Sequence, residues 1–266
     1  MFIKYLSCQN RLSAAARFSP VICGVLSGLS RSILVYLLQK FYIVRNKSTS
    51  PLKPCDMDNI TKVWTGPLPP DSPYVRPYRF YFVQNGVEKN WDLLKVHDSV
   101  SIILFHRTRK TLIFVKQFRP AVYHSIVTSE VGSLEVDLKQ YPPKLGITIE
   151  LCAGIVDKAK SFAEIAREEV LEECGYDVPS ERLEEVLTFR AGVGSTGPLQ
   201  KMYFCEVTDD DKATKGGGVD DEIIEVVELS IPEVREMIKQ GASVNSPPSC
   251  LFGIMWFLAN KLDKDL

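Results

Sequence analysis

The sequence has few of the residues that build zinc sites and none of the spacings typical of them. Among its 266 residues are three histidines and seven cysteines, and no two cysteines stand in a C-x-x-C pair. A structural zinc site needs four closely spaced ligands, and a disulfide framework uses its cysteines in pairs. The scattered, odd-numbered cysteines therefore predict reduced thiols in an intracellular protein.

Residues 1–55 contain no acidic residue, and the chain has no clean apolar run of membrane-spanning length. The apolar stretch 21–44 is interrupted by Arg31 and Lys40. A span needs about 20 consecutive apolar residues, so no stable membrane span is expected. Three interpretations stay open: a mitochondrial transit peptide, a signal or anchor segment, or a dispensable, disordered extension with Met57 as the working start. We expect a cytoplasmic protein, or a mitochondrial one if the extension is a transit peptide.

The charge is distributed unevenly along the chain. The formal net charge is −1, and eight Lys or Arg in residues 1–55 leave −9 on residues 56–266. An acidic body argues against a nucleic-acid scaffold, which needs a basic face. The predicted organisation is an N-terminal extension (1–57), a proline-rich linker (58–77), a β-hairpin region (78–97) and a main domain (98–266).

Hydrophobic periodicity predicts a sheet with helices. Strands are expected at residues 78–83, 87–91, 98–107, 111–119, 146–153, 184–190, 201–207 and 223–229, and a closing helix at 249–264. Asn85-Gly86, between the first two strands, is the strongest short hairpin signal. The G-x-G-x-x-G at 192–197 is followed by Pro198 and a strand, whereas a dinucleotide-binding loop opens a helix. A tight turn or a loop bordering the substrate is favoured instead.

Residues 154–176 carry the strongest helical signal. Ser161 and Glu164 form a capping box of the S-x-x-E form, and Gly175 supplies a stop, so a helix is expected between them. At about 100° per residue the apolar residues gather on one side, which predicts the face that packs on the core. They are Phe162, Ile165, Ala166 and Val170.

Three glutamates share this apolar side: Glu169, Glu172 and Glu173. Like charges at i, i+3 and i+4 repel one another, and more strongly where they are desolvated. A divalent cation with oxygen ligands, Mg²⁺ or Mn²⁺, would neutralise them. The alternative is a solvated acidic helix with Arg167 as counter-charge. Glu164 and Glu168 already occupy the solvent side, which favours the metal.

The same stretch resembles the signature of the Nudix hydrolases, G-x5-E-x7-R-E-U-x-E-E-x-G-U, in which U is apolar. The positions in register are Gly154, Glu169, Val170, Glu172, Glu173, Gly175 and Tyr176. Two positions depart: Lys160 replaces the first Glu, and Glu168 replaces the Arg, with Arg167 one residue early. These departures bear on a supporting ion pair and on the number of metals, and leave the chemistry unchanged. The segments that resemble the nucleotide-sugar branch are 91–92 (WD), 97–100 (HDSV), 115–123 (VKQFRPAVY), 150–154 (ELCAG), 172–176 (EECGY), 192–194 (GVG), 216–218 (GGG) and 224–227 (IEVV).

The resemblance implies an α+β fold, a Nudix α/β/α sandwich with a mixed sheet at residues 98–266, plus an N-terminal antiparallel β-hairpin used in homodimerisation. It also implies Mg²⁺-dependent hydrolysis of the diphosphate bond in a nucleoside diphosphate sugar, with UDP-glucose giving UMP and glucose 1-phosphate. ADP-ribose is the alternative substrate. A non-catalytic module that binds nucleotide sugars is the more distant alternative.

The resemblance further implies the site residues. Glu169, Glu172, Glu173, Glu222 and the Ala153 carbonyl would hold the metal, and Asp220 would join the four glutamates in catalysis. Arg119 and Glu150 would bind substrate. Arg119 suits bidentate contact with phosphate, although a structural salt bridge fits the sequence equally well. The Gly-rich stretch 216–222 is expected to be mobile, and to bring Glu222 or Asp220 to a bound water or metal.

Overall fold

The computed structural model describes residue 57 and residues 59–72, 75–127, 136–219 and 222–262. The chain divides into two units, Met1–Lys53 and Pro54–Leu266, and all described residues belong to the second. Apart from Met57, the predicted extension lies outside the described residues. The elements are β1 (Arg76–Gln84), β2 (Val87–Lys95), β3 (Ser99–His106), β4 (Thr111–Phe118), α3 (Pro120–Val127), η3 (Pro143–Gly146), β5 (Ile147–Glu150), β6 (Cys152–Ile155), α4 (Phe162–Cys174), η4 (Ser180–Arg182), β7 (Glu184–Arg190), β8 (Leu199–Val207), η5 (Asp209–Asp211), β9 (Glu225–Ser230), α5 (Ile231–Met237) and α6 (Pro248–Asn260).

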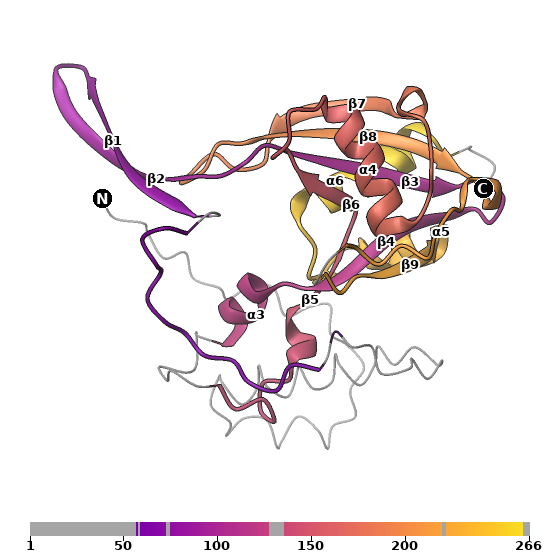
Figure 1. Cartoon of the computed structure of the whole chain (residues 1–266), viewed down its shortest axis with the longest axis horizontal. Coiled ribbons are helices and arrows are strands. Elements are labelled where there is room, and N and C mark those ends of the chain that lie inside the picture. The colour runs from indigo at the N-terminus through magenta and orange to yellow at the C-terminus, as the bar shows by residue number, and fades with distance from the viewer. Residues whose placement is uncertain (1–56, 58, 73–74, 128–135, 220–221, 263–266) are drawn as a thin grey trace, which may run out of the picture. The chain divides into compact units, whose positions relative to one another are not determined.

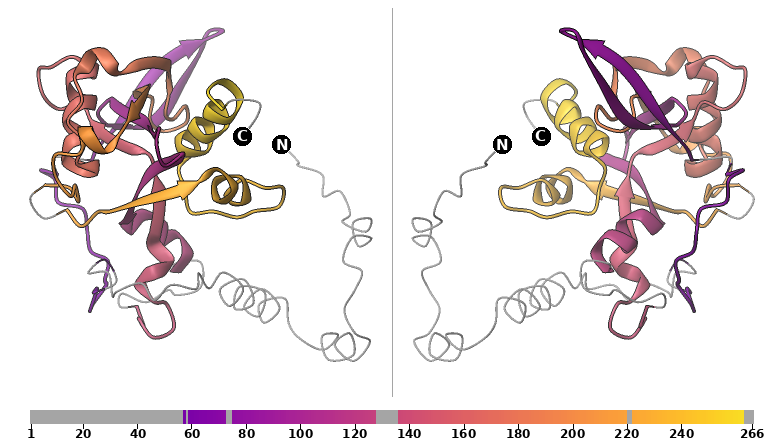
Figure 2. Two further views of the ribbon diagram at one scale, coloured as in Figure 1. Left: turned by 90° about the vertical axis from the view of Figure 1, so that its right-hand side faces the viewer. Right: turned by 90° about the vertical axis from the view of Figure 1, so that its left-hand side faces the viewer.

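A seven-stranded mixed sheet carries helices on both faces (Figure 1). Successive side chains of β3 point to opposite faces, and both faces are covered, so this strand is apolar almost throughout. On one face its residues Val100, Ile102 and Leu104 join a core cluster with Ile165 and Val170 of α4. On the other face the core cluster contains Ile103 and Phe105 of β3, Val234 of α5, and Ile254 and Phe257 of α6. The expected α/β/α sandwich with a mixed sheet is confirmed (Figure 2).

The central strand β3 has different partners at its two ends. Along one edge it pairs with β8 in parallel. Along the other edge, antiparallel β6 pairs with its beginning and antiparallel β4 with its last three residues. The chain makes this arrangement by crossing directly from β5, which pairs with β4, to β6, which pairs with β3. Residues 147–155 therefore bridge two strands and present Ala153 and Gly154 beside α4.

The predicted hairpin is present as a separate two-stranded sheet, β1 paired with β2. Asn85 and Gly86 take positive φ values of 56° and 75° at its turn, as this signal predicts. Its base is attached to the 192–197 loop, because the Trp91 indole N–H donates to the Gly194 carbonyl at 3.2 Å. β8 follows this loop, so the expected strand, and no helix, opens after the G-x-G-x-x-G sequence.

Two short helices were absent from the sequence-based predictions. α3 has eight residues and α5 seven, which is too short for a clear helical period. α5 nevertheless carries a signal, since Ser230 and Glu233 form a capping box that starts it. No helix in the described part of the chain is long and apolar enough to cross a membrane.

Candidate functional site

The termini of α4 are built as the sequence predicts. The Ser161 side chain accepts a hydrogen bond from the Glu164 N–H, and the Glu164 carboxylate accepts one from the Ser161 N–H, which completes the capping box. Gly175 ends the helix with a left-handed φ of 74°. A Cβ there would lie 2.3 Å from the Thr214 carbonyl oxygen, so the position requires glycine for two reasons.

The glutamates Glu169, Glu172 and Glu173 form what we call the acid face of α4. Glu173 is only 5% exposed and accepts a hydrogen bond from the Ala153 N–H at 2.9 Å. Glu169 lies against Gly154, where a Cβ would come within 2.0 Å of the carboxylate oxygen Oε1. The glycine that opens the signature therefore makes room for a carboxylate beside strand β6.

The surroundings of the acid face disfavour the ionised form of its carboxylates. Burial, followed by the charges of Glu173 and Glu172, raises the pKa of Glu169 to about 8. Burial likewise raises the pKa of Glu173 to about 7, against the Ala153 N–H, which lowers it. No Lys or Arg of the described chain forms an ion pair with Glu169 or Glu173. Such raised pKa values are typical of functional sites.

The Ala153 carbonyl faces the acid face. The Ala153 N–H donates to Glu173 and not to the neighbouring strand β3, against which Ala153 pairs with Ser101. In an antiparallel ladder a residue directs its N–H and C=O to the same edge of its strand. The carbonyl therefore leaves β6 on the same side as the N–H, towards α4, as the predicted ligand role requires.

The two departures from the signature compensate for each other. Lys160 Nζ donates to Glu168 Oε1, and Lys158 lies 3.6 Å from the other oxygen of the same carboxylate. The pattern has an acidic residue at position 160 and a basic one at 168, whereas this chain has the reverse. The supporting ion pair, which the sequence left open, is thus present with its charges exchanged. Glu168 is also partly buried by it, with 25% of its side chain exposed, and not fully on the solvent side.

Arg119 and Glu150, both predicted to bind substrate, contact each other. Nε and Nη2 of Arg119 each donate to one oxygen of the Glu150 carboxylate at 2.7 Å. Glu150 also accepts from Thr148 Oγ1 at 2.6 Å, which the alternation of residues along β5 places on the same face. The salt bridge that the sequence left open is present. The Arg119 side chain remains 45% exposed, and the charges of Glu150, Glu173 and Glu222 raise its pKa.

Sequence reasoning missed Thr148 and Gln117 as supports of this pair. Gln117 Nε2 lies 3.5 Å from Glu150 Oε2, on the strand that pairs with β5. Both residues flank site residues that the sequence did identify, one two positions before Glu150 and one two positions before Arg119. Alternate residues of a strand point to the same face, so a position two residues from a known site residue was the signal that could have identified them.

The glycines Gly216, Gly217 and Gly218 form a clasp on the C-terminal end of α4. The N–H groups of Gly217 and Gly218 donate to the Glu173 and Glu172 carbonyls, at 2.8 and 3.1 Å. All three glycines have positive φ, and a Cβ at Gly216 would lie 2.3 Å from the Glu173 carbonyl oxygen. Gly216–Gly218, the first part of the stretch expected to be mobile, are thus tied to the helix, because the last carbonyls of a helix need donors.

The clasp leads directly to Glu222. Its carboxylate accepts a hydrogen bond from the Val219 N–H at 3.2 Å. Its charge raises the pKa of both Glu169 and Glu173, so it lies within electrostatic reach of the acid face. Asp220, the alternative to Glu222, lies outside the described residues.

The donors present fit a hard divalent cation in their chemistry. Within residues 57–262, as far as they are described, no three His, Cys, Asp or Glu side chains lie close enough together to hold a metal ion as they stand. The acid face nevertheless offers carboxylate oxygens whose mutual repulsion raises the pKa of Glu169, and a cation would relieve that repulsion. Oxygen ligands of this kind suit Mg²⁺ or Mn²⁺.

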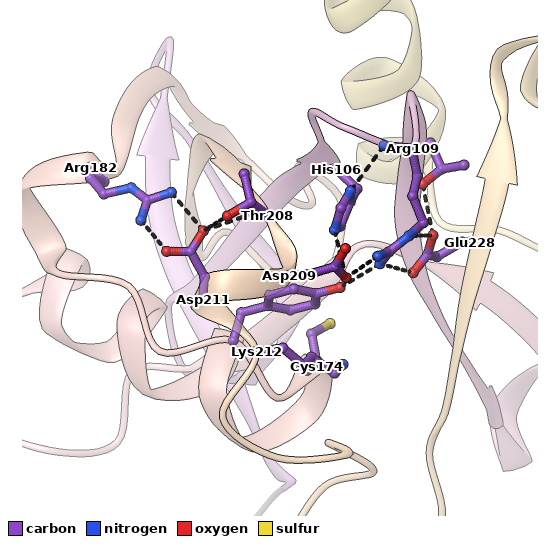
Figure 3. A network of polar contacts seen from close by, with 11 residues as sticks. His106, Arg109, Cys174, Arg182, Thr208, Asp209, Asp211, Lys212 and Glu228 are labelled. Atoms are coloured by element: carbon purple, nitrogen blue, oxygen red, sulfur yellow. Dashed lines mark hydrogen bonds and ion pairs between the residues drawn. The ribbon is translucent and has the colours of Figure 1, made fainter.

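A second group of acidic side chains lies beyond the C-terminal end of α4 (Figure 3). Together with the two arginines that bind these acids, it forms what we call the arginine network, whose members are Arg109, Arg182, Asp209, Asp211 and Glu228. Arg109 binds Glu228 through Nε and Nη2, and also contacts Asp209 and the Tyr176 hydroxyl. Arg182 binds Asp211 through both terminal nitrogens. These arginines lower the pKa of Glu228 and of Asp211, which is the opposite of what occurs at the acid face.

Comparison of the chain with models of known protein families gives no match. Among known proteins, the chain is 39% identical over 200 residues to uridine diphosphate glucose pyrophosphatase NUDT14 of Bos taurus, covering 71% of this chain and 90% of that protein. It is 38% identical over 215 residues to the Mus musculus protein of that name, covering 76% and 96%. It is also 31% identical over 173 residues to the GDP-mannose pyrophosphatase of Citrobacter koseri, covering 60% and 81%. Since the first two matches span nearly the whole length of those proteins at 38–39% identity, the chain belongs to the Nudix hydrolase family.

Proposed function

We propose that the protein hydrolyses the diphosphate bond of nucleoside diphosphate sugars in a reaction that depends on Mg²⁺ or Mn²⁺, with UDP-glucose as substrate. The observation that carries the proposal is the acid face of α4. Glu173 is buried and Glu169 partly buried, and both have raised pKa values, although the charge of Arg119 acts to lower the pKa of Glu173. A stabilising role does not explain buried acids without ion-pair partners, whereas binding of a metal and a diphosphate does.

The reaction adds water to one phosphorus and breaks the bridging P–O bond, so UDP-glucose gives UMP and glucose 1-phosphate. Bound divalent metal would offset the charge of the diphosphate and acidify the attacking water. In the proposal Glu169, Glu172, Glu173 and the Ala153 carbonyl are its oxygen donors. Glu222 completes that set or accepts the proton of the attacking water. Asp220 is the second candidate for this role.

Arg119 and Glu150 bind substrate in this proposal through a preset geometry. The bidentate hydrogen bonds to Glu150 fix the plane of the Arg119 guanidinium. The Arg119 side chain is nevertheless 45% exposed to solvent. An oriented guanidinium is suited to a phosphate oxygen, and the ordering cost is already met in the free protein. Thr148 and Gln117 contribute by holding Glu150.

The identity of the sugar nucleotide rests on the relatives. The mammalian relatives are named for uridine diphosphate glucose and the bacterial one for GDP-mannose. The mammalian matches have the higher identity, which favours UDP-glucose for this chain.

We also propose a homodimer, formed through the β1–β2 hairpin. One face of the hairpin carries Phe80 and Trp91 opposite each other in register, and both side chains are more than half exposed. Phe82 stacks on Phe80 along the same face. Apolar aromatic surface of this kind is typical of interfaces. A cytoplasmic location, or a mitochondrial one through residues 1–57, stays a prediction.

The function is tested by incubating the full chain with UDP-glucose, with and without Mg²⁺, and identifying the products by ³¹P NMR. ADP-ribose and GDP-mannose are compared side by side. We expect UMP and glucose 1-phosphate only when metal is present. Binding of UDP-glucose without any release of monophosphate would show that the protein is a non-catalytic module. A preference for ADP-ribose would show that ADP-ribose, the alternative substrate, is the one hydrolysed.

Glu173→Gln provides the residue-level test. We expect turnover at saturating Mg²⁺ to fall by about 10²–10³-fold, since a buried charge that acts on the reacting groups is removed. The matched control is Glu236→Gln, because Glu236 is an exposed glutamate on α5 paired with Lys239. Unchanged turnover in Glu173→Gln would sink the proposed role of the acid face.

A further inference from the structure

Two adjoining cavities lie beside the proposed site. The residues that line them have no role other than the ones described above. The first has a volume of about 300 Å³ and contains Asn59, Gln117 and Glu222 in its lining. The second has a volume of about 360 Å³. Ile60 and Phe118 line both, so the two cavities share a wall. Glu222 lines the first cavity only, which is therefore the one nearer to the proposed site.

Part of the lining of both cavities comes from Met57 and residues 59–65, which precede the hairpin in sequence. Met57 is only 2% exposed. Val63 packs against the cluster around Tyr123, and its carbonyl accepts a hydrogen bond from the Val136 N–H at 3.3 Å. The segment is therefore attached to the main domain and forms a built wall of the cavities.

The chemistry of the lining differs between the two cavities. In the first, Asn59 and Gln117 offer amide donors and acceptors and Glu222 a carboxylate, among apolar side chains that include Ile223 and Ile224. The lining of the second is largely apolar and aromatic, with Trp64, Phe118 and Tyr123 among its side chains. A cavity with polar groups beside a largely apolar one suits the ribose and the flat base, which are neighbouring groups in a nucleotide.

We propose that the second cavity binds the base of the substrate and the first its ribose, with Trp64 as the stacking residue. The assignment rests on the proposed function for the nature of the substrate. A hexose in the aromatic cavity would leave most of its hydroxyl groups without partners, whereas a base can place its faces against aromatic rings. Both volumes fall within the range of small-molecule sites, at its lower end.

Trp64 allows a clean test because its side chain lies at the rim. It is 66% exposed, so its replacement removes stacking surface without opening a cavity in the core. Binding of UMP and of glucose 1-phosphate is measured by isothermal titration calorimetry on the full chain, in buffer containing Mg²⁺. Both are products of the proposed reaction, so neither is turned over during the titration.

In Trp64→Ala we expect the Kd for UMP to rise about tenfold or more, the usual effect of losing one stacked aromatic, and the Kd for glucose 1-phosphate to stay unchanged. The matched control is Met255→Ala, an exposed apolar residue of α6 that lies outside both cavities, which should leave both values unchanged. An unchanged Kd for UMP, or a loss confined to glucose 1-phosphate, would overturn the assignment. So would a loss in Trp91→Ala with none in Trp64→Ala, since the base would then lie at the hairpin.

The outcome is separable from that of the proposed function. If the chain does not hydrolyse UDP-glucose but binds UMP in a Trp64-dependent manner, the cavity assignment stands and the catalytic proposal fails. If UDP-glucose is hydrolysed while Trp64→Ala changes neither the Kd for UMP nor the KM, the assignment alone fails.

Discussion

The acid face of α4 and the arginine network contain the same type of side chain in opposite electrostatic settings. At the acid face, Glu173 is buried beside Ala153 and Glu169 is partly buried beside Gly154, and burial together with like charge raises their pKa values. In the arginine network, Glu228 is held by Arg109 and by Thr111 Oγ1, and its pKa is lowered. The two regions are joined through Tyr176, which directly follows the Gly175 stop of α4.

Under the proposed function, the difference separates acids that stabilise the fold from acids that are kept for chemistry. Charged hydrogen bonds such as those of Glu228 stabilise a fold by about 1.5–3 kcal/mol each. Buried carboxylates without an ion-pair partner lower its stability, and they persist where another binding partner compensates. The comparison predicts different consequences for substitutions in the two regions. A change at the acid face should affect turnover, and a change in the arginine network should affect stability.

The largest contrast is expected between Glu169→Gln and Glu228→Gln. Glu169→Gln should lower kcat by about 10²–10³-fold, because a carboxylate that acts on the reacting groups is removed. Glu228→Gln should lower the free energy of unfolding by about 2 kcal/mol, because its bonds from Arg109 lose their ionic partner, while kcat is retained. Urea unfolding and steady-state kinetics on both variants give the two readouts. An equal loss of kcat in both variants would show that the two regions do not differ in their contribution to turnover.

The clasp supports the acid face from the C-terminal end of α4, and Gly216→Ala tests it. A Cβ would meet the Glu173 carbonyl oxygen at 2.3 Å while φ is 69°, so stability should fall by about 2–3 kcal/mol and kcat should fall with it. Gly241→Ala is the matched control, since φ there is 81° and no atom lies within 4 Å of the added Cβ. It should cost only about 1 kcal/mol. If both variants behave alike, the clasp contributes nothing beyond its backbone conformation.

A smaller effect is expected in the pH dependence of stability without divalent metal. The pKa of Glu169 rises from an ordinary 4.5 to about 8 on folding, so its contribution is full below pH 4.5 and is lost as the pH rises towards 8. The pKa of Glu228 is lowered, so its contribution is present above pH 4.5 and is lost as the pH falls. The Tm of the wild type should therefore decline on both sides of a maximum at about pH 4.5. Glu169→Gln should flatten the alkaline side alone and Glu228→Gln the acidic side alone, and a profile unchanged by either would contradict the assignment of these shifts.

The elements that the sequence predicted well are those with local signals. The capping box at Ser161, the stop at Gly175 and the turn at Asn85-Gly86 depend on residues a few positions apart, and the structure has all three. The α/β/α sandwich followed from the family resemblance and is confirmed. α5 could have been found from Ser230 and Glu233, whereas α3 has no cap of this kind.

The contacts that the sequence could not predict depend on long-range register. Arg119 and Glu150 are 31 residues apart, and they meet because β4 and β5 pair with Val115 opposite Glu150. The clasp contacts α4 from more than 40 residues downstream through backbone donors, and side-chain patterns carry no record of such bonds. Lys160 and Glu168 depart from the signature eight residues apart, and only the fold of the 156–160 loop against α4 shows them to be a pair.

The most direct test of the account is the binding of Mg²⁺ and Mn²⁺ to the wild type, Glu169→Gln and Glu228→Gln, measured by isothermal titration calorimetry without substrate. The account predicts metal binding to the wild type and to Glu228→Gln with similar Kd, and a Kd at least about tenfold higher in Glu169→Gln, because that variant removes a donor oxygen and its charge. Equal binding by all three proteins, or binding lost only in Glu228→Gln, would contradict the claim that the acid face is kept for a divalent cation.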